Sequence, residues 1–397
     1  MRYRYNENFK NGIAGWWFEK SDIMKTYDDN HILMLDVEYG LTCKLNCSYC
    51  FRRNDLRDGT RREELSKANI IEIARQAKEL GAKSIHFVGK GESLEKQDFP
   101  GIVHIIGKDM GMIPLIFTAG HVLGDDQLAK EIHGKTGKEI INDLYHSNAS
   151  IILKINSLNH KIQNEVVNTY RLKYRDVGER IFNYTKYRDI ALERLMKAGF
   201  NSWENNPTRL GTATVMLKSN YHELFHHYRY FRSLNIYPII NTVVPCGRTK
   251  EPVEVKKMSP TREEKLDLWK KIYEFNIENG IKYEGISSYV GGHICSQLGY
   301  AMYINVYGEV YDCPSSTNEA LGNFKFNGSE GKELKILWDK SPCRKNYKNG
   351  LDNGCPWRFS NQAMIPKSLF RKVHEHLKKK YPNDQNVQNF VPPIGYG

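Results

Sequence analysis

The sequence predicts an α/β fold: a partial (β/α)6 TIM-like barrel followed by a small α+β domain. From about residue 31 to residue 245, short apolar runs alternate with longer segments of helical periodicity, as in parallel strands joined by helices. Six such repeats are fewer than the eight of a closed barrel, so we expect a partial barrel. After residue 246 the sequence becomes richer in Gly, Tyr and Cys, and its apolar runs become shorter.

The predicted strands are the apolar runs His31–Tyr39, Ser84–Val88, Met112–Ala119, Ser150–Ser157, Arg209–Lys218 and Tyr237–Pro245. The predicted barrel helices are Glu63–Leu80, Asp125–Tyr145, Tyr184–Lys197 and Tyr221–Leu234. The first of these helices has apolar residues at the spacing of one face, and Gly81 follows it as a stop signal.

We expect four parts along the chain: an N-terminal extension over 1–30, the barrel over 31–245, the second domain over 246–360, and a basic helix with a tail over 361–397. The second domain should contain a helix at Arg262–Asn279 and a strand at Tyr300–Val306. Ser368–Lys380 has one apolar and one basic face, which predicts an amphipathic helix, and Asn383–Gly397 has the composition of a tail.

The composition is that of a folded, basic protein. Of the 397 residues, 40% are hydrophobic and 12% aromatic, which excludes an intrinsically disordered chain. There are 58 Lys and Arg against 46 Asp and Glu, so the net charge is +12. No run approaches the roughly 18 to 20 apolar residues of a membrane span, and the first residues lack an apolar signal core. We therefore expect a cytoplasmic protein with no membrane partner.

Three cysteines follow directly on the first predicted strand. Cys43, Cys47 and Cys50 lie at the strand end where barrel enzymes place their chemistry. Three thiolates with this spacing can wrap one corner of an iron–sulfur cluster. Because a [4Fe-4S] cluster normally takes four Cys ligands, one iron would stay open to a cofactor. A structural zinc is the alternative, although zinc sites usually have paired knuckles and four matched ligands.

The segment Leu41–Phe51, with Tyr49 just before the last cysteine, resembles the cluster motif of the radical S-adenosylmethionine (radical SAM) superfamily. The resemblance implies a [4Fe-4S] cluster on the three cysteines and S-adenosylmethionine at its open iron, with Tyr49 in the cofactor site. It also implies the reaction: reductive cleavage of S-adenosylmethionine to a 5′-deoxyadenosyl radical, which takes a hydrogen atom from a substrate C–H bond.

The second predicted strand runs into Gly89-Lys90-Gly91-Glu92-Ser93, which resembles the Gly-Gly-Glu loop of this family. In that loop the glycines allow close approach of the backbone, and the carboxylate pairs with the ammonium group of the methionine moiety. The resemblance therefore places Gly89, Gly91 and Glu92 in the cofactor site. Lys90 and Ser93 depart from the usual glycine and proline. A phosphate-binding loop is excluded, because its four-residue gap before Gly-Lys-Ser/Thr is missing.

Two further strand ends resemble the same family. Thr118 lies in a segment similar to the Thr-Asn-Gly turn after the third strand. Asn156 and Ser157 lie in a segment similar to the fourth strand, whose polar residues contact the ribose. Taken alone, each is equally typical of an ordinary turn or strand end. Their order along the chain supports a cofactor-binding role.

Four cysteines spread over the second domain are Cys295, Cys313, Cys343 and Cys355. The spacing of the first two, with a glycine ahead of Cys313, resembles the opening of the SPASM and twitch domains, which carry auxiliary clusters. A full SPASM domain needs about seven cysteines, so the shorter twitch-like form with one auxiliary [4Fe-4S] cluster fits better. Cys343 and Cys355 as buried thiols or zinc ligands remain the alternative.

An isolated cysteine, Cys246, ends the sixth predicted strand. At the mouth of the barrel its thiol is a candidate catalytic hydrogen-atom donor to a substrate radical, as in some radical epimerases. An inert buried thiol and an auxiliary cluster ligand are the alternatives.

Arginines are concentrated just after the three N-terminal cysteines, at Arg52, Arg53, Arg57, Arg61 and Arg62. This patch could receive an anionic substrate or an acidic electron donor such as flavodoxin or ferredoxin, or it is a solvated basic face. RNA is the less favoured alternative for this patch, because the sequence shows no RNA-binding motif.

For the function, the resemblance implies a radical SAM enzyme that oxidises, epimerises or cross-links its substrate. A peptide or protein substrate, as in the maturases of peptides and sulfatases, is favoured over a small molecule such as an aminosugar. Whether the enzyme is an oxidoreductase or an isomerase stays open. A hypothesis of a different class is a non-catalytic iron–sulfur protein that binds a cluster or transfers electrons.

Overall fold

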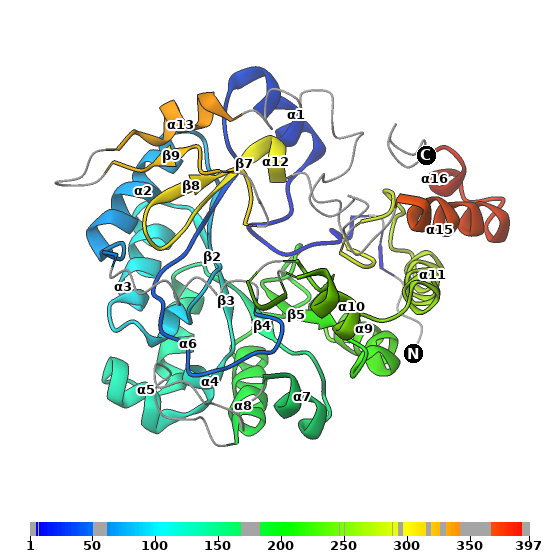
Figure 1. The fold of residues 1–397 in the computed structure, drawn as a ribbon, viewed down its shortest axis with the longest axis horizontal. Helices are drawn as coiled ribbons and strands as arrows, with labels where there is room; N and C mark the ends of the chain where they lie inside the picture. Colours follow the sequence, from blue (N-terminus) through cyan, green and yellow to red (C-terminus); the bar gives the residue numbers. More distant parts are fainter. Residues whose placement is uncertain are drawn as a thin grey trace.

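In the computed structural model the described residues are 5–6, 8–50, 62–167, 183–245, 247–249, 251–287, 289–292, 297–314, 319–325, 331–341 and 367–390. Their strands form one sheet in the order β6-β5-β4-β3-β2-β1-β7-β8-β9 (Figure 1). The six barrel strands are β1 (Met34–Val37), β2 (Ser84–Phe87), β3 (Ile113–Thr118), β4 (Ser150–Lys154), β5 (Leu210–Met216) and β6 (Tyr237–Thr242). Neighbours among them pair in parallel, which confirms the predicted partial barrel.

The sheet continues past β1 into the C-terminal part of the chain. The added strands are β7 (Ala301–Ile304), β8 (Glu309–Tyr311) and β9 (Gly322–Asn323). β7 pairs in parallel with β1, with Met34 opposite Ala301, whereas β8 and β9 add antiparallel. The small C-terminal domain therefore extends the barrel sheet on the edge of β1.

Helices surround the barrel strands (Figure 1). The helices up to β6 are α1 (Lys20–Asp29), α2 (Lys67–Glu79), α3 (Phe99–His104), α4 (His121–Gly124), α5 (Asp126–His133), α6 (Gly137–His146), α7 (His160–Val167), α8 (Tyr184–Lys197) and α9 (Leu224–Ser233). The apolar face of α2, with Ile70 and Ile73, is buried against outward-facing strand residues such as Leu35 and Ile85. Because side chains alternate along a strand, the residues next to Leu35 and Ile85 point to the opposite face of the sheet, away from α2.

One predicted helix is two helices in the structure. The expected helix at Asp125–Tyr145 is divided into α5 and α6, because Gly134 adopts a positive φ of 68° and ends α5. Thr136 then starts α6 with a capping box: its hydroxyl accepts from the Glu139 amide, and the Glu139 carboxylate accepts from the Thr136 amide.

Two later helices follow the sequence expectations closely. They are α11 (Arg262–Glu278) and α15 (Lys367–Lys380), which pack together with an apolar cluster between them (Figure 1). The part of the predicted tail that the structure describes is not an unstructured tail. It contains the short helix α16 (Gln385–Gln388), and Val387 is fully buried in the same cluster. The remaining helices are α10 (Pro252–Met258), α12 (Gln297–Tyr300) and α13 (Leu334–Lys340).

The segment before β1 fills the inside of the barrel at the N-terminal ends of the strands. Ile13 forms a bridge to Thr208, just before β5, and its side chain is fully buried. The Gly15 carbonyl accepts hydrogen bonds from Ser84 Oγ, at 2.5 Å, and from His86 Nε2, at 2.8 Å. The Trp16 ring packs edge-on against Phe117, at 5.9 Å between ring centroids. This segment therefore closes one end of the barrel.

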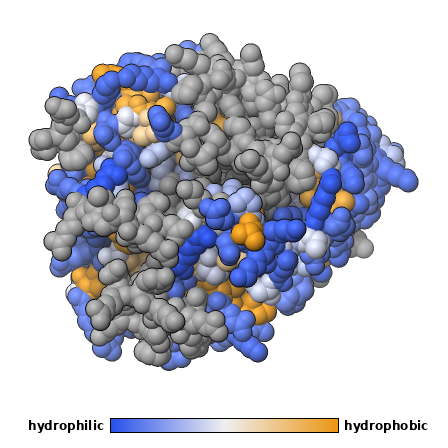
Figure 2. Space-filling view, in the orientation of Figure 1, coloured by the Kyte–Doolittle hydropathy of each residue, from blue (hydrophilic) through white to orange (hydrophobic). Residues whose placement is uncertain are grey.

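Figure 2 shows one face of the molecule. The described residues on this face are mostly hydrophilic, with separate apolar areas, which agrees with the charged composition. Within the described ranges, no helix has both the length and the apolar character needed to cross a bilayer.

Replacing Trp16 by alanine should lower the free energy of unfolding by about 3–5 kcal/mol, because removing a buried indole leaves a cavity in the barrel. Urea denaturation followed by circular dichroism measures this change. Trp203→Ala is the matched control, since Trp203 is 57% exposed and its loss should cost less than about 1 kcal/mol. Equal losses in the two variants would contradict the packing described for Trp16.

Candidate functional site

The predicted site residues come together at the C-terminal ends of the barrel strands. The cysteine loop follows β1, the Gly89–Glu92 loop follows β2, and Thr118 ends β3. Asn156 and Ser157 follow β4. Because these strands are parallel, their carboxyl ends lie at one edge of the sheet, opposite the end that Trp16 closes.

The cysteine loop is held by backbone hydrogen bonds to α7. The Asn46 amide donates to the Val167 carbonyl, at 3.2 Å, and the Ser48 amide donates to the Val166 carbonyl, at 3.1 Å. These carbonyls belong to the last turn of α7, whose final carbonyls have no partner within the helix. The end of α7 therefore fixes the middle of the loop.

Arg248, in the turn after β6, holds the same loop from the other side. Its Nη1 donates to the carbonyls of Asn46, at 3.0 Å, and Cys47, at 2.8 Å. Its backbone amide donates to the Cys50 carbonyl, at 3.1 Å. One residue thus fixes the backbone of two cysteines. No local sequence pattern predicts this role of Arg248, because its partners lie about 200 positions earlier in the chain.

Glu92 is buried where the loops after β1 and β2 meet the end of β3. Its carboxylate accepts hydrogen bonds from Thr118 Oγ1, at 2.8 Å, and from the Ala119 amide, at 2.7 Å. Its own amide donates to the Thr42 carbonyl, at 2.7 Å. Burial raises the pKa of Glu92, whereas the nearby His121 and the Ala119 amide oppose that rise. A cationic partner would therefore stabilise the ionised form of the Glu92 carboxylate.

The glycines of this loop are required by close approach. A Cβ at Gly91 would lie 2.3 Å from the Gly40 carbonyl oxygen, and one at Gly89 would lie 2.2 Å from Glu38 Cγ. Both contacts are far shorter than real Cβ contacts, so neither position accepts a side chain without movement of the loop after β1. The two glycines let the Glu92 loop lie directly on the start of the cysteine loop.

A second buried carboxylate supports the cysteine loop. Glu95 Oε1 lies 2.8 Å from His121 Nε2, and both side chains are buried. The same oxygen accepts from the Lys44 amide, at 3.1 Å. This pair therefore joins the residue after Cys43 to the helix that follows β3.

Asn156 links Tyr49 to the strands. Its Nδ2 donates to the Tyr49 hydroxyl, at 2.8 Å, and its Oδ1 accepts from the Val215 amide, at 3.1 Å. Ser157 Oγ accepts from the Asn159 amide, at 2.9 Å. Both side chains are fully buried. The structure shows them supporting the site from within, and their predicted contact with a ribose stays a prediction.

Lys154 is a site residue that was not predicted from the sequence. Its ammonium lies 4.7 Å from the centroid of the Tyr49 ring. Burial lowers the pKa of Lys154 to about 8, and the Cys47 and Cys50 thiols oppose that fall. The residue is partly accessible although protein surrounds most of its side chain. Period-two alternation could have found it, because Lys154 is the last residue of β4 and lies two positions before Asn156, which follows the strand.

The three N-terminal cysteines carry thiols and are partly accessible. Burial raises the pKa of Cys43, and the Cys47 thiol and the carboxylates of Glu95 and Glu92 raise it further. Such a thiol ionises readily only when it binds a cation, which suits a metal ligand. Within the described ranges, no three Cys, His, Asp or Glu side chains converge as ligands of a single metal ion. An iron–sulfur cluster does not need such convergence on one ion, because each cysteine thiolate binds a different iron of the cluster.

The remaining cysteine predictions are largely outside the described residues. Cys246, Cys295, Cys343 and Cys355 all lie there. Cys313 is described: it is a buried thiol that follows β8. Of the five arginines after Cys50, Arg62 is described, and its guanidinium pairs with Glu309, at 2.7 Å.

Comparison with known proteins identifies the domain that these residues form. Residues 37–231 match the Radical SAM superfamily. The chain therefore contains a radical SAM domain. The match includes the cysteine loop, the Glu92 loop and the ends of β3 and β4, and it implies a [4Fe-4S] cluster and S-adenosylmethionine as cofactors. The thiols of the cysteine loop and the buried Glu92 carboxylate are suited to hold them.

Relatives of known sequence or structure agree with the radical SAM domain. A protein of Archaeoglobus fulgidus named as a probable GTP 3′,8-cyclase is 41% identical over 61 residues, which is 15% of this chain and 19% of that protein. SuiB of Streptococcus suis, bound to the precursor peptide SuiA, has a TM-score of 0.56 at 16% identity, over 82% of this chain and 69% of SuiB. The structure of anSMEcpe with bound AdoMet also has a TM-score of 0.56, at 13% identity, over 90% of this chain and 96% of that one. At these identities the two structures show a shared fold.

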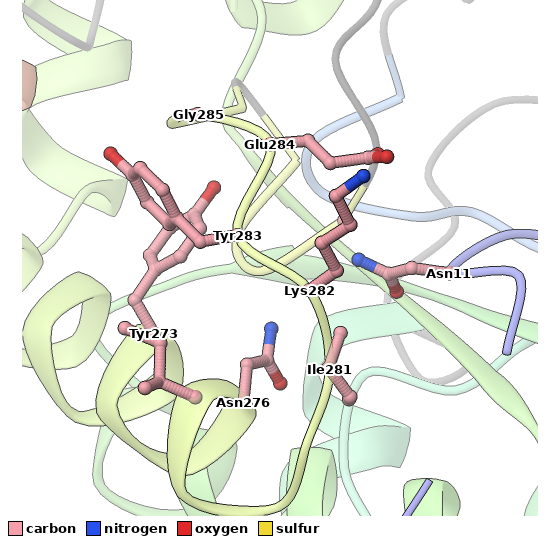
Figure 3. Close-up of a pocket in the computed structure, with 10 residues that line it drawn as sticks. Asn11, Tyr273, Asn276, Ile281, Lys282, Tyr283, Glu284 and Gly285 are labelled. Atoms are coloured by element: carbon pink, nitrogen blue, oxygen red, sulfur yellow. The ribbon is translucent and has the colours of Figure 1, made fainter. Parts of the chain in front are cut away.

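A pocket among the described residues, shown in Figure 3, has no residue of the cysteine loop in its lining. It lies between the end of α11, the segment 281–285 and Asn11, which is two residues from the barrel-filling Ile13. The two asparagines of its lining are already bonded, since the side-chain amides of Asn11 and Asn276 both donate to the Gly291 carbonyl. The pocket therefore belongs to the packing at the closed end of the barrel.

Arg248→Met should weaken cluster binding by roughly 10- to 100-fold, the usual effect of losing a residue that orients metal ligands. The measurement is the rate at which a chelator removes iron from the anaerobically reconstituted protein, followed by visible absorbance. Arg75→Met is the control, because Arg75 is an exposed residue of α2 that pairs with Glu72 and Glu79. If both variants retain iron as the unmodified protein does, the orienting role of Arg248 is wrong.

Proposed function

We propose that the protein is a radical SAM enzyme that modifies a peptide or protein by hydrogen-atom abstraction, leading to oxidation, epimerisation or cross-linking. The observation that carries the proposal is the meeting of the cysteine loop and the buried Glu92 at the open end of the barrel. The Glu92 amide bonds directly to Thr42, beside Cys43. A cluster and a cofactor ammonium group bound there would be neighbours.

The cofactors and the residues of this chain would have separate roles in this reaction. The cluster and S-adenosylmethionine, when bound, supply reductive cleavage and the 5′-deoxyadenosyl radical. Cys43, Cys47 and Cys50 would hold the cluster, and Glu92 would accept the ammonium group of the methionine moiety. Lys154 would place a positive charge on the wall beside Tyr49.

A peptide substrate is supported by the shared fold with SuiB, whose structure contains a precursor peptide. A small-molecule substrate is the second candidate, and the local match to a probable GTP 3′,8-cyclase supports it. Fractions of a cell extract distinguish the two. Peptide substrates are supported if a fraction increases 5′-deoxyadenosine formation and loses this effect after protease digestion. An effect that survives digestion supports the small molecule.

The reconstituted protein with dithionite and S-adenosylmethionine should form 5′-deoxyadenosine, measured by chromatography under argon. Glu92→Gln should weaken cofactor binding roughly 10- to 100-fold, because it removes a charge-assisted hydrogen bond. Glu79→Gln is the control, since Glu79 is an exposed residue paired with Arg75. The absence of 5′-deoxyadenosine from the unmodified protein would favour a non-catalytic iron–sulfur protein.

We also propose that Cys295, Cys313, Cys343 and Cys355 bind one auxiliary cluster. Iron analysis should then give about eight irons per chain, whereas one cluster gives about four. Cys313→Ala should remove about four irons and leave those of the cysteine loop in place. A value of about four in the unmodified protein would contradict the auxiliary cluster.

For the electron donor we propose an acidic partner such as flavodoxin or ferredoxin, which the net charge of +12 supports.

A further inference from the structure

The turn between β7 and β8 lies beside the Glu92 loop and is held rigidly. The side-chain oxygen of Asn305 accepts from the amides of Tyr307 and Glu309, both at 3.0 Å. The side-chain amide of Asn305 donates to the Glu309 carboxylate, at 2.6 Å. The backbone that carries Tyr307 is therefore held in place by the turn itself.

Two cations contact the Tyr307 ring. The Lys90 ammonium lies 5.0 Å from the ring centroid, and the Arg62 guanidinium carbon lies 4.3 Å from it. Arg62 also pairs with Glu309, so the ring and a carboxylate of the same hairpin hold one guanidinium. Lys90 itself is 8% exposed, which strengthens its attraction to the ring.

Lys90 belongs to the loop that carries Glu92. It stands between Gly89 and Gly91, so it is the one residue of this triplet with a side chain to anchor. To reach Tyr307 it passes over the end of β1, because β1 lies between β2 and β7 in the sheet. Glu38, just after β1, joins the same contact: its carboxylate accepts from the Val306 amide, at 3.0 Å, and Gly89 packs against its Cγ.

We propose that Tyr307 is a positioning residue for the Glu92 loop, so that the C-terminal hairpin controls how well the radical SAM domain binds its cofactor. This inference rests on the proposed function. A loop with glycines on both sides of Lys90 has many accessible conformations. Docking of the Lys90 ammonium on the ring selects the one in which Glu92 meets Thr118 and Ala119.

The test is the Kd for S-adenosylmethionine, measured by anaerobic equilibrium dialysis of the reconstituted full chain. Tyr307→Leu removes the ring and should weaken binding roughly three- to tenfold. Tyr307→Phe keeps the ring and should bind within about twofold of the unmodified protein. Lys90→Met should match Tyr307→Leu, and the double variant should be no weaker than either single variant. Iron content should be the same in all of them.

A second readout does not depend on the cofactor. Amide hydrogen exchange at residues 89–92 should be faster in Tyr307→Leu than in Tyr307→Phe. Tyr381→Leu is the matched control, because the ammonium of Lys380, the last residue of α15, lies 5.5 Å from the Tyr381 ring, and both residues are outside the radical SAM domain.

The outcomes separate the two proposals. Unchanged binding and exchange in Tyr307→Leu would overturn the inference about Tyr307. Equal losses in Tyr307→Phe and Tyr307→Leu would also overturn it, since the ring would not be the cause. If the unmodified protein with its full iron content bound no S-adenosylmethionine, the proposed function itself would fail.

Discussion

The hydrogen bonds of Glu92 hold the open end of the barrel together. A buried carboxylate is costly unless its oxygens are bonded, and here one oxygen meets Thr118 and the other meets the Ala119 amide. The Glu92 amide meets the Thr42 carbonyl. Three loops that follow β1, β2 and β3 are therefore fixed by one residue. The cysteine loop has its position because the Glu92 loop lies directly on it, and the two glycines of that loop make the close approach feasible.

Much of the fold could be predicted from local sequence patterns. The strands and α8 follow from periodicity and stop signals, because each depends on residues close in sequence. The division at Gly134 was missed although the signals were present: a glycine, followed by Thr136 and Glu139 at capping-box spacing. The pairing of β7 with β1 could not be read from any local pattern. It depends on the barrel leaving the edge of β1 open to a distant segment.

The site shows the same limit. The cysteines and Glu92 could be predicted because each belongs to a short sequence motif on a single loop. Arg248 could not, since its role arises only when the turn after β6 meets the cysteine loop. Lys90 was recognised as a departure from the family pattern. The ring that its ammonium contacts, Tyr307, lies on a hairpin more than 200 residues later in the chain. Residues that support a site through tertiary contacts leave little local signal.

The pairing of β1 with β7 also has a consequence for how the chain folds during synthesis. β1 is among the first elements to leave the ribosome, yet one of its edges gains a partner only when Ala301–Ile304 emerge. Until then the nascent barrel presents a row of unpaired backbone groups beside the cysteine loop, and such edges invite pairing with other chains. Contacts between segments so distant in sequence form slowly. The C-terminal hairpin is thus the segment that ends the exposure of this edge.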